Sequence, residues 1–492
     1  MRGIWQLARQ MMTADARRAG SHAVRLGLAV VLYLAVTRAS FTPWRSAVGL
    51  PLFHSQLLIT AFYLTINAIF GFSQAIAEEK EEGTLGLLRL ADVSPLSIIL
   101  GKMAGRLADA GLMLALQFPF TIVAITLGGV SWSQVVAAYA ALAAYLWLLA
   151  TLGIAASVMQ PTGGSAARAT AVLIALYLFP PYVAITGMVR WQWLVSAYRY
   201  ISLPMRLTAV TESSFNEAAW CAPIAFGLAG GFACLLAAWW AFDRMALAPE
   251  TARPAIRWPV VRSRSSSRRA WERPVVWREF VFLTGGVPWL VGRIAGHSLI
   301  VLAMIGVQDS IGHIFAWASI FSGLLSLIDG TWSASRLFRD EIRDRTWSSL
   351  VQTPHGIARL ALEKFCGWAL GMLPAIVMPY VFIVTTIAVH EHTRFDMAME
   401  LLIGSVTVGL GVFAYLHLLV LMSLHFGWKA TPMTLTISFA AAWIYVVTAF
   451  STSMGVGERC GAFVATCVLL GLVMVALQFA IVRRLRVLAE TA

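Results

Sequence analysis

Long stretches without charged residues dominate this sequence, and short charged loops separate them. A helix needs about 20 consecutive apolar residues to cross a bilayer. Stretches free of Asp, Glu, Lys and Arg lie at residues 46–77, 110–167, 169–189, 218–242, 310–328, 365–390, 401–428, 430–457 and 460–482. The longest stretch, 110–167, has room for two helices with a turn at Gly128 and Gly129.

Two weaker candidates complete the pattern. Residues 26–37 lie between Arg25 and Arg38, whose side chains can extend to the two membrane surfaces. Residues 286–308 include Arg293 near their beginning. With these two, the pattern predicts about twelve transmembrane helices, six before the middle of the chain and six after it.

The middle of the chain has a different composition. Residues 243–273 are rich in Arg, Ser and Pro and include the run RSRSSSRR, which is typical of a polar linker. We therefore expect an all-α integral membrane protein. Its parts would be a six-helix domain at 1–242, a basic cytoplasmic linker at 243–273 and a second six-helix domain at 274–492.

The basic residues indicate the orientation. If the N-terminus faces the cytoplasm, 29 basic residues fall in cytoplasmic loops and seven in outside loops, with Arg293 left in a span. The positive-inside rule expects this asymmetry. We therefore expect a multi-pass protein of the cytoplasmic (inner) cell membrane with both termini in the cytoplasm. The segment Met1–Ala19 is amphipathic and suits a helix lying in the interface, as does 274–280; a ragged start to each span is the alternative.

The composition agrees with a membrane location. Hydrophobic residues make up 59% of the chain and charged residues 12%, about half the charged share of a soluble domain. The net charge of +13 then reflects contact with anionic membrane lipids, and no nucleic-acid partner is expected.

Signatures of catalysis and cofactor binding are missing from the sequence. The five cysteines are scattered, and the chain holds no G-x-x-x-x-G-K-[ST], H-E-x-x-H or G-x-S-x-G. The cluster His390-Glu391-His392 favours loop polarity over a metal site. We expect a protein that is not an enzyme, with no cofactor, no metal and no catalytic residue.

An internal similarity links the two halves of the chain. The loop after the second predicted span, around residues 76–105, has a counterpart 262 residues later. The residues that match at this constant spacing are Glu78 and Asp340, Glu79 and Glu341, Glu82 and Asp344, Thr84 and Thr346, Leu88 and Leu350, Lys102 and Lys364, and Gly105 and Gly367. An acidic cluster, a threonine, a leucine and a lysine thus recur in register without a gap.

This pattern predicts a short amphipathic helix in each loop, on the cytoplasmic side. A helix beginning near Glu82 or Asp344 would carry acidic residues in its first turn, where the helix dipole favours them. The expected apolar faces consist of Leu85, Leu88 and Leu90 in the first copy and of Trp347, Leu350 and Val351 in the second. Such a helix is typical of a docking element for a soluble partner. If the acids only solvate the loop end, no partner is needed.

The run Glu81-Glu82-Gly83-Thr84-Leu85-x-Leu87-Leu88, followed by Gly101-Lys102, resembles the cytoplasmic coupling-helix signature of type-2 ABC export permeases (type V exporters). The second copy is similar, with Asp344-Arg345-Thr346-Trp347, Thr353-Pro354 and Glu363-Lys364. The resemblance implies two fused six-helix transmembrane domains, an interfacial N-terminal helix and two coupling helices.

In that family a separate P-loop ABC ATPase docks on the coupling helices, so the resemblance implies a permease subunit with two copies of such a partner. The docking residues that it implies are Glu78, Glu79, Glu82, Thr84, Leu85, Leu88, Asp340, Glu341, Asp344, Thr346, Trp347 and Leu350. The two copies differ. Pro354 of the second copy matches the family's proline, whereas the first copy has Asp92 there, and Trp347 of the second copy takes the place of Leu85. Unequal docking is therefore possible. A non-transporting scaffold or sensor and a secondary carrier are the alternative functions.

Overall fold

A computed structural model describes the chain at residues 19–41, 48–185, 200–246, 272–305, 311–343, 345–389, 395–426 and 456–490, with isolated positions between these ranges. Within these ranges every regular element is a helix, and no strand occurs. Nine of the described helices are long and apolar enough to cross a membrane, and two shorter apolar helices span Ser21–Thr37 and Gly163–Leu178. Most of the predicted span 430–457 lies outside the described residues, so the number twelve stays a prediction.

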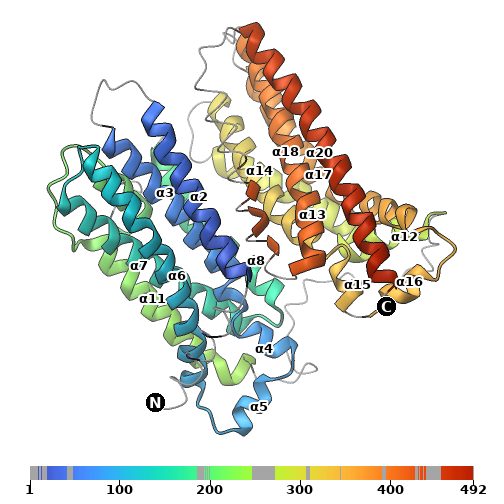
Figure 1. Ribbon diagram of the computed structural model, residues 1–492, viewed down its shortest axis with the longest axis horizontal. Coiled ribbons are helices and arrows are strands. Elements are labelled where there is room, and N and C mark those ends of the chain that lie inside the picture. The colour runs from blue at the N-terminus through green and yellow to red at the C-terminus, as the bar shows by residue number, and fades with distance from the viewer. Residues whose placement is uncertain are drawn as a thin grey trace. The chain divides into compact units, whose positions relative to one another are not determined.

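The chain folds into two compact units (Figure 1). The helices of the first unit are α2 (Ala19–Phe41), α3 (Gly49–Phe70), η1 (Phe72–Gln74), α4 (Ala77–Glu81), α5 (Leu85–Leu90), α6 (Pro95–Thr126), α7 (Trp132–Met159), α8 (Gly163–Ile185), α10 (Leu203–Val210), α11 (Ala222–Ala241) and η2 (Phe242–Ala246). Most of the predicted interfacial helix at 1–19 and of the linker at 243–273 lies outside the described residues.

The second unit contains the remaining helices. They are α12 (Pro274–Arg278), η3 (Glu279–Leu283), α13 (Gly286–Ile305), α14 (Ile311–Arg336), α15 (Arg339–Arg343), α16 (Trp347–Val351), α17 (Ile357–Val389), α18 (Phe395–Phe426) and α20 (Val456–Glu490). In this unit α14 packs against α13, α17 and α18, and α18 packs against α20.

Helix α3 lies at the centre of the first unit, where it packs against α2, α6 and α7, while α7 also packs along α11. A polar contact crosses this apolar core, because the hydroxyls of Thr65 on α3 and Tyr145 on α7 lie 2.8 Å apart. The second unit has a comparable contact, with 3.0 Å between the hydroxyls of Thr331 on α14 and Tyr415 on α18. Such hydrogen bonds satisfy polar groups that would otherwise be buried without a partner.

Local sequence sets the ends of the long helices. The Ser94 hydroxyl accepts a hydrogen bond from the Ser97 amide, and Pro95 follows at the first helical position, so α6 begins there. The predicted turn between α6 and α7 is present, with φ of 85° at Gly128 and 87° at Gly129. These left-handed angles suit glycine, which has no Cβ.

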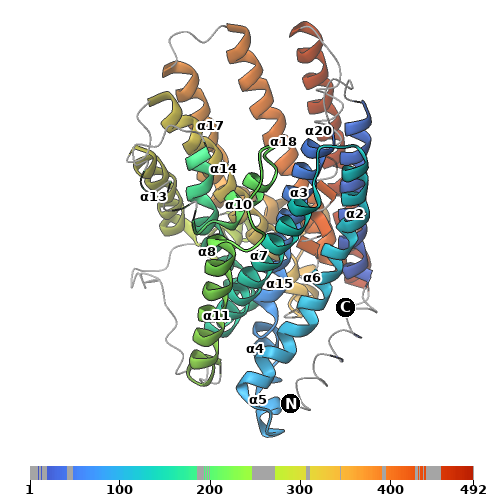
Figure 2. The same ribbon diagram turned by 90° about the vertical axis from the view of Figure 1, so that its left-hand side faces the viewer.

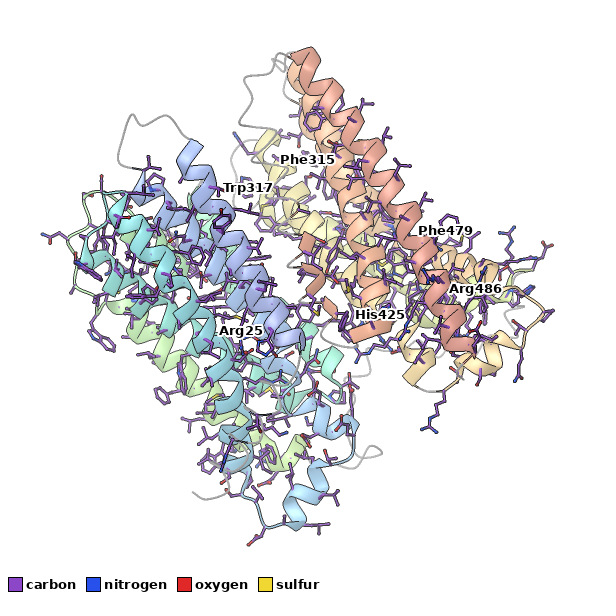
Figure 3. The ribbon with its side chains drawn as sticks, viewed as in Figure 1. Arg25, Phe315, Trp317, His425, Phe479 and Arg486 are labelled. Atoms are coloured by element: carbon purple, nitrogen blue, oxygen red, sulfur yellow. The ribbon has the colours of Figure 1, made fainter. Side chains whose placement is uncertain are left out.

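Charged side chains inside each unit are paired. On α2, Arg25 forms an ion pair with Asp109 of α6 (Figure 3). On α13, the Nε of Arg293 lies 2.6 Å from the carboxylate of Asp329 on α14. Large apolar side chains are exposed along the outer helices, as Phe479 on α20 shows with an exposed fraction of 73% (Figure 3). Charged side chains that are paired inside the bundle, together with apolar side chains on its outer surface, suit a bundle surrounded by lipid.

Candidate functional site

The two matched loops fold into the same local structure. We call residues 77–92 the first elbow and residues 339–354 the second elbow. In each elbow a five-residue helix is followed by a short turn and a second short helix, α4 and α5 in the first and α15 and α16 in the second. The spacing of 262 residues holds for the starts of all four helices and for the long helices α6 and α17 that follow. Figures 1 and 2 both place α5 at the far end of the first unit, beyond α4.

A glutamate, a threonine and a lysine hold the first elbow together. The Glu79 carboxylate accepts hydrogen bonds from the Thr84 hydroxyl and from the Lys102 ammonium. The Thr84 amide also donates to the Glu79 carbonyl at 3.0 Å. Lys102 lies on α6, so these contacts fix the elbow to the beginning of that long helix. We call Glu79, Thr84 and Lys102 the first knot.

The second elbow contains the same arrangement at the matching positions. The Glu341 carboxylate accepts from the Thr346 hydroxyl and, at 3.3 Å, from the Lys364 ammonium. The Thr346 amide donates to the Glu341 carbonyl at 2.9 Å. These residues form the second knot. The side chain of Lys364 is 1% exposed, against 10% for Lys102, so the second knot is more deeply buried.

Helix α12 and the residue that follows it add two charged groups to the second knot. Lys364 also donates to the Glu279 carboxylate at 2.5 Å, and an Arg278 nitrogen lies 2.7 Å from a Glu341 oxygen. Burial raises the pKa of the Glu279 carboxyl, while the neighbouring cations Lys364 and Arg278 offset part of that rise. The second elbow is thus tied to the segment that precedes the first long helix of its unit.

The turn inside each elbow places one residue in the left-handed region. Gly83 has a φ of 70° and Arg345 a φ of 57°. Because this turn interrupts the helix, α5 begins at Leu85 and α16 at Trp347. The sequence had favoured a start near Glu82 or Asp344 with acidic residues in the first turn; no acidic residue lies in the first turn of α5 or α16. The acids occupy the first turns of α4 and α15.

The apolar residues of the elbows are divided between two faces. Leu85 and Trp347, which match in position, are each 3% exposed and pack into their units. Leu88 and Leu350 are half-buried beside them. The predicted apolar face of Leu85, Leu88 and Leu90 is therefore not continuous, since Leu90 is 85% exposed.

The remaining predicted acids differ in their surroundings. A Glu78 oxygen lies 3.6 Å from a nitrogen of Arg106, and an Asp340 oxygen lies 2.7 Å from a nitrogen of Arg336. Glu82 is exposed to solvent. Asp344 lies outside the described residues. Among the described acidic residues that were predicted to dock a partner, Glu82 is thus the one exposed to solvent.

Lys80 anchors the first elbow in a way that the sequence pattern did not indicate. Its ammonium donates to the carbonyls of Ser157, Val158 and Gln160 at the end of α7, at 2.5–2.9 Å. The Ser157 hydroxyl in turn accepts from the amides of Ile76 and Ala77 at 2.9 Å. Positive charge at a helix C-terminus is stabilising because the last carbonyls lack intrahelical partners.

Glu81 makes a further link to the same region, because its carboxylate accepts from the Gly163 amide at the beginning of α8, at 2.8 Å. At the positions that match Lys80 and Glu81, the second elbow has Ile342 and Arg343. Ile342 is partly buried against the apolar core of its unit and has no side-chain donor. The connection through Lys80 is therefore specific to the first elbow.

Taken together, these contacts fasten each elbow to the beginning of a long helix. Their charged groups neutralise one another, and none of the described clusters of His, Cys, Asp and Glu has three or more members placed to hold a metal ion. The arrangement links the residue that precedes α5 or α16 to a lysine of α6 or α17 through a shared carboxylate.

Comparison of the chain with known protein families finds none that matches, and comparison with curated proteins likewise finds no match. The fold itself defines a class. Within the described ranges the protein is all-helical, and its nine long apolar helices are compatible with a multi-pass membrane protein.

Proposed function

We propose that this protein is the permease subunit of an ATP-driven ABC export system. It forms the translocation path and couples to a separate P-loop ATPase, two copies of which dock on two cytoplasmic coupling helices, α5 and α16. The observation that carries the proposal is the recurrence of one knot, built from Glu79, Thr84 and Lys102 in the first elbow and from Glu341, Thr346 and Lys364 in the second.

A coupling element must transmit displacement without bending. Each knot joins α4 or α15, and the threonine that directly precedes α5 or α16, to a lysine two turns inside the following long helix, α6 or α17. We therefore expect the elbow and the long helix to move as one body. Because the chain has no P-loop sequence, the energy would come from the partner. Closure of an ATPase dimer would then move the two bundles as rigid bodies between inward-open and outward-open states.

The proposal includes a topology. It comprises twelve transmembrane helices in two repeats of six, the linker 243–273 and both termini in the cytoplasm, and the cytoplasmic (inner) membrane as the location. The excess of basic residues in the loops assigned to the cytoplasm supports this orientation.

Topology is the first test. Single cysteines replace Glu82 and Ser349 in a chain whose native cysteines are changed to alanine or serine, and a membrane-impermeant thiol reagent is added to right-side-out or inverted membrane vesicles. Both positions are exposed, so both should react in inverted vesicles only. Labelling of the two positions from opposite sides would refute the proposal.

Function is the second test. The chain is reconstituted in liposomes with a P-loop ABC ATPase identified by copurification with it, and ATP hydrolysis and ATP-dependent release of lipid-like or peptide-like substrates are measured. A permease stimulates hydrolysis and moves substrate. Binding of the ATPase without stimulation or transport would favour a scaffold or sensor instead.

Charge reversal at the first elbow needs care, because its acids differ in their contacts. Glu82→Lys changes an exposed side chain and should weaken docking without unfolding the bundle. Glu79→Lys would place a second cation beside Lys102 inside the knot and should destabilise the fold. Only the first substitution therefore reports on docking.

A further inference from the structure

The two elbows share their inner contacts but present different outer faces. On α5, Leu87 and Leu90 are 64% and 85% exposed, and their spacing of three residues puts them on the same side of the helix. The matching residues of the second elbow, Ser349 and Gln352, are also exposed but are polar. The first elbow therefore carries an apolar outer patch that the second lacks.

Lipid is an unsuitable cover for this patch. Helix α6 begins at Pro95, just after the elbow, and carries Lys102 and Arg106 within its first turns. At 1.5 Å per residue, the path from Pro95 to Arg106 is about 16 Å long. Charged side chains at this level belong at the headgroups, so α5 stands beyond the hydrocarbon layer, on the aqueous side. Figures 1 and 2 agree that α5 is the outermost element at this end of the unit.

The charges around the two patches also differ. Residues 81–92 carry three acids and one arginine, whereas 343–354 carry two arginines and one aspartate. In the first elbow Glu82 and Asp92 are exposed at either end of the patch. A partner surface that covers Leu87 and Leu90 would therefore be apolar at its centre and basic at its rim.

The polar contacts of the two elbows also differ. The first elbow is joined through Lys80 and Glu81 to the end of α7 and the beginning of α8, in addition to α6. The second elbow has Ile342 in place of Lys80, and its charged contacts lead to α12, α14 and α17. Both elbows are thus fastened to long helices of their units, but through different residues.

We propose that the first elbow alone is the high-affinity docking site, and that it binds an apolar groove with a basic rim on the ATPase, while the second elbow makes a weaker, polar contact. This inference rests on the proposed function, and it makes the two docking events unequal. The first elbow supplies most of the binding free energy, and the second supplies less.

A titration with matched variants tests the inference. The full chain in nanodiscs is titrated with a P-loop ABC ATPase identified by copurification with it, in the presence of an ATP analogue that is not hydrolysed. Leu87→Ser with Leu90→Gln gives the first elbow the outer residues of the second and should raise Kd by at least about 30-fold, because two apolar anchors are lost. Ser349→Ala with Gln352→Ala should change Kd by less than about threefold, as contacts outside a hot spot do.

Salt dependence provides a second readout. With a basic rim opposite Glu82 and Asp92, the association rate of the unaltered chain should fall as ionic strength rises. Glu82→Gln with Asp92→Asn should flatten this dependence, and asparagine accepts the left-handed φ of 57° at position 92. If the association rate of the double variant depends on salt as strongly as that of the unaltered chain, the partner surface has no basic rim opposite Glu82 and Asp92.

Three outcomes can be told apart. Equal effects of the two pairs of substitutions would overturn the asymmetry and leave the proposed function standing, whereas failure of the unaltered chain to bind the ATPase would overturn the proposed function itself. Leu87→Trp, examined in nanodiscs of brominated phosphatidylcholine, should show no quenching of the added tryptophan relative to the unaltered chain. Added quenching would assign the patch to lipid and refute the inference. Because Leu87 and Leu90 are exposed, the thermal midpoint of the double variant should stay close to that of the unaltered chain.

Discussion

The Lys80 ammonium donates to the backbone carbonyl of Ser157 at 2.9 Å, while the Ser157 hydroxyl accepts from the amides that begin α4. Two residues thus satisfy the C-terminus of α7 and the N-terminus of α4 together. Both ends would otherwise expose backbone groups without intrahelical partners. The junction fastens the first elbow to the fourth long helix of its unit, and its strength can be measured.

Lys80→Met should loosen this junction. The substitution keeps the length of the side chain but removes the donor to three carbonyls, at a cost of about 1–2 kcal/mol. Hydrogen–deuterium exchange should become faster in residues 76–81 and at the end of α7. Exchange in α6 should stay unchanged. Ser157→Ala should accelerate exchange in the same segments. Ile342→Met is the matched control in the second elbow, and an equal acceleration there would contradict the special role of Lys80.

The two knots should differ in their tolerance of losing the lysine. Lys364→Met leaves two carboxylates, Glu279 and Glu341, facing each other in a buried site, and should cost about 3–5 kcal/mol. Lys102→Met leaves only Glu79, which is partly solvated, and should cost about 1.5–3 kcal/mol. The thermal midpoint in detergent should therefore fall further for Lys364→Met. A larger fall for Lys102→Met would show that burial does not govern the strength of the knots.

The left-handed turns offer a reciprocal pair of substitutions. Gly83→Ala forces a Cβ into a φ of 70°, and since no atom lies within 4 Å of that Cβ, the cost is backbone strain alone, about 1–2 kcal/mol. Arg345→Gly relieves similar strain at a φ of 57° but increases the entropy of the unfolded chain by a comparable amount. We expect the thermal midpoint to fall for Gly83→Ala and to change little for Arg345→Gly. A similar loss in both variants would mean that the Arg345 side chain makes a stabilising contact.

The sequence predicted the position of the elbows because their shared residues recur at one spacing. Glu79 and Lys102 are 23 residues apart, and their recurrence as Glu341 and Lys364 singled out all four residues without predicting that each glutamate contacts its lysine. Repetition, however, identifies only those residues that the two copies share. Lys80 lacks a counterpart in the second half, and a search for matched residues passes over it.

The sequence alone could not predict which side of each short helix faces the core. Six residues with leucine at positions 85, 87, 88 and 90 are apolar on nearly every side, so the pattern does not reveal which leucines face inward. The answer depends on the left-handed turn at Gly83, which sets the angle at which α5 leaves α4. The sequence placed Leu85, Leu88 and Leu90 on one apolar face, whereas in the structure Leu85 is buried and Leu87 and Leu90 are exposed.

The pH dependence of stability should report on Glu279. Burial raises the pKa of this carboxyl, so the folded chain binds its proton at a higher pH than the unfolded chain does. Between the ordinary glutamate pKa of about 4.3 and the raised value, this group therefore favours folding more as pH falls. Glu279→Gln lacks the titration, so its thermal midpoint should equal or exceed that of the unaltered chain at pH 7, and the gap should narrow as pH falls toward the ordinary glutamate pKa. A gap that widens on acidification would reverse the sign and contradict the assignment.

Removing one charge of the ion pair between Arg293 and Asp329 should destabilise the second unit more than removing both charges. Asp329→Asn leaves the Arg293 guanidinium with backbone carbonyls of Thr284 and Gly371 as its remaining neighbours, at 2.9 and 3.2 Å. A cation left without its counter-ion in a poorly solvated bundle costs about 3–5 kcal/mol. Arg293→Met combined with Asp329→Asn removes both charges and should recover most of that loss. Thermal midpoints of the two single variants and the double variant form a double-mutant cycle. If the two single losses simply add in the double variant, the pair is not coupled, and the charges are held separately by backbone or water.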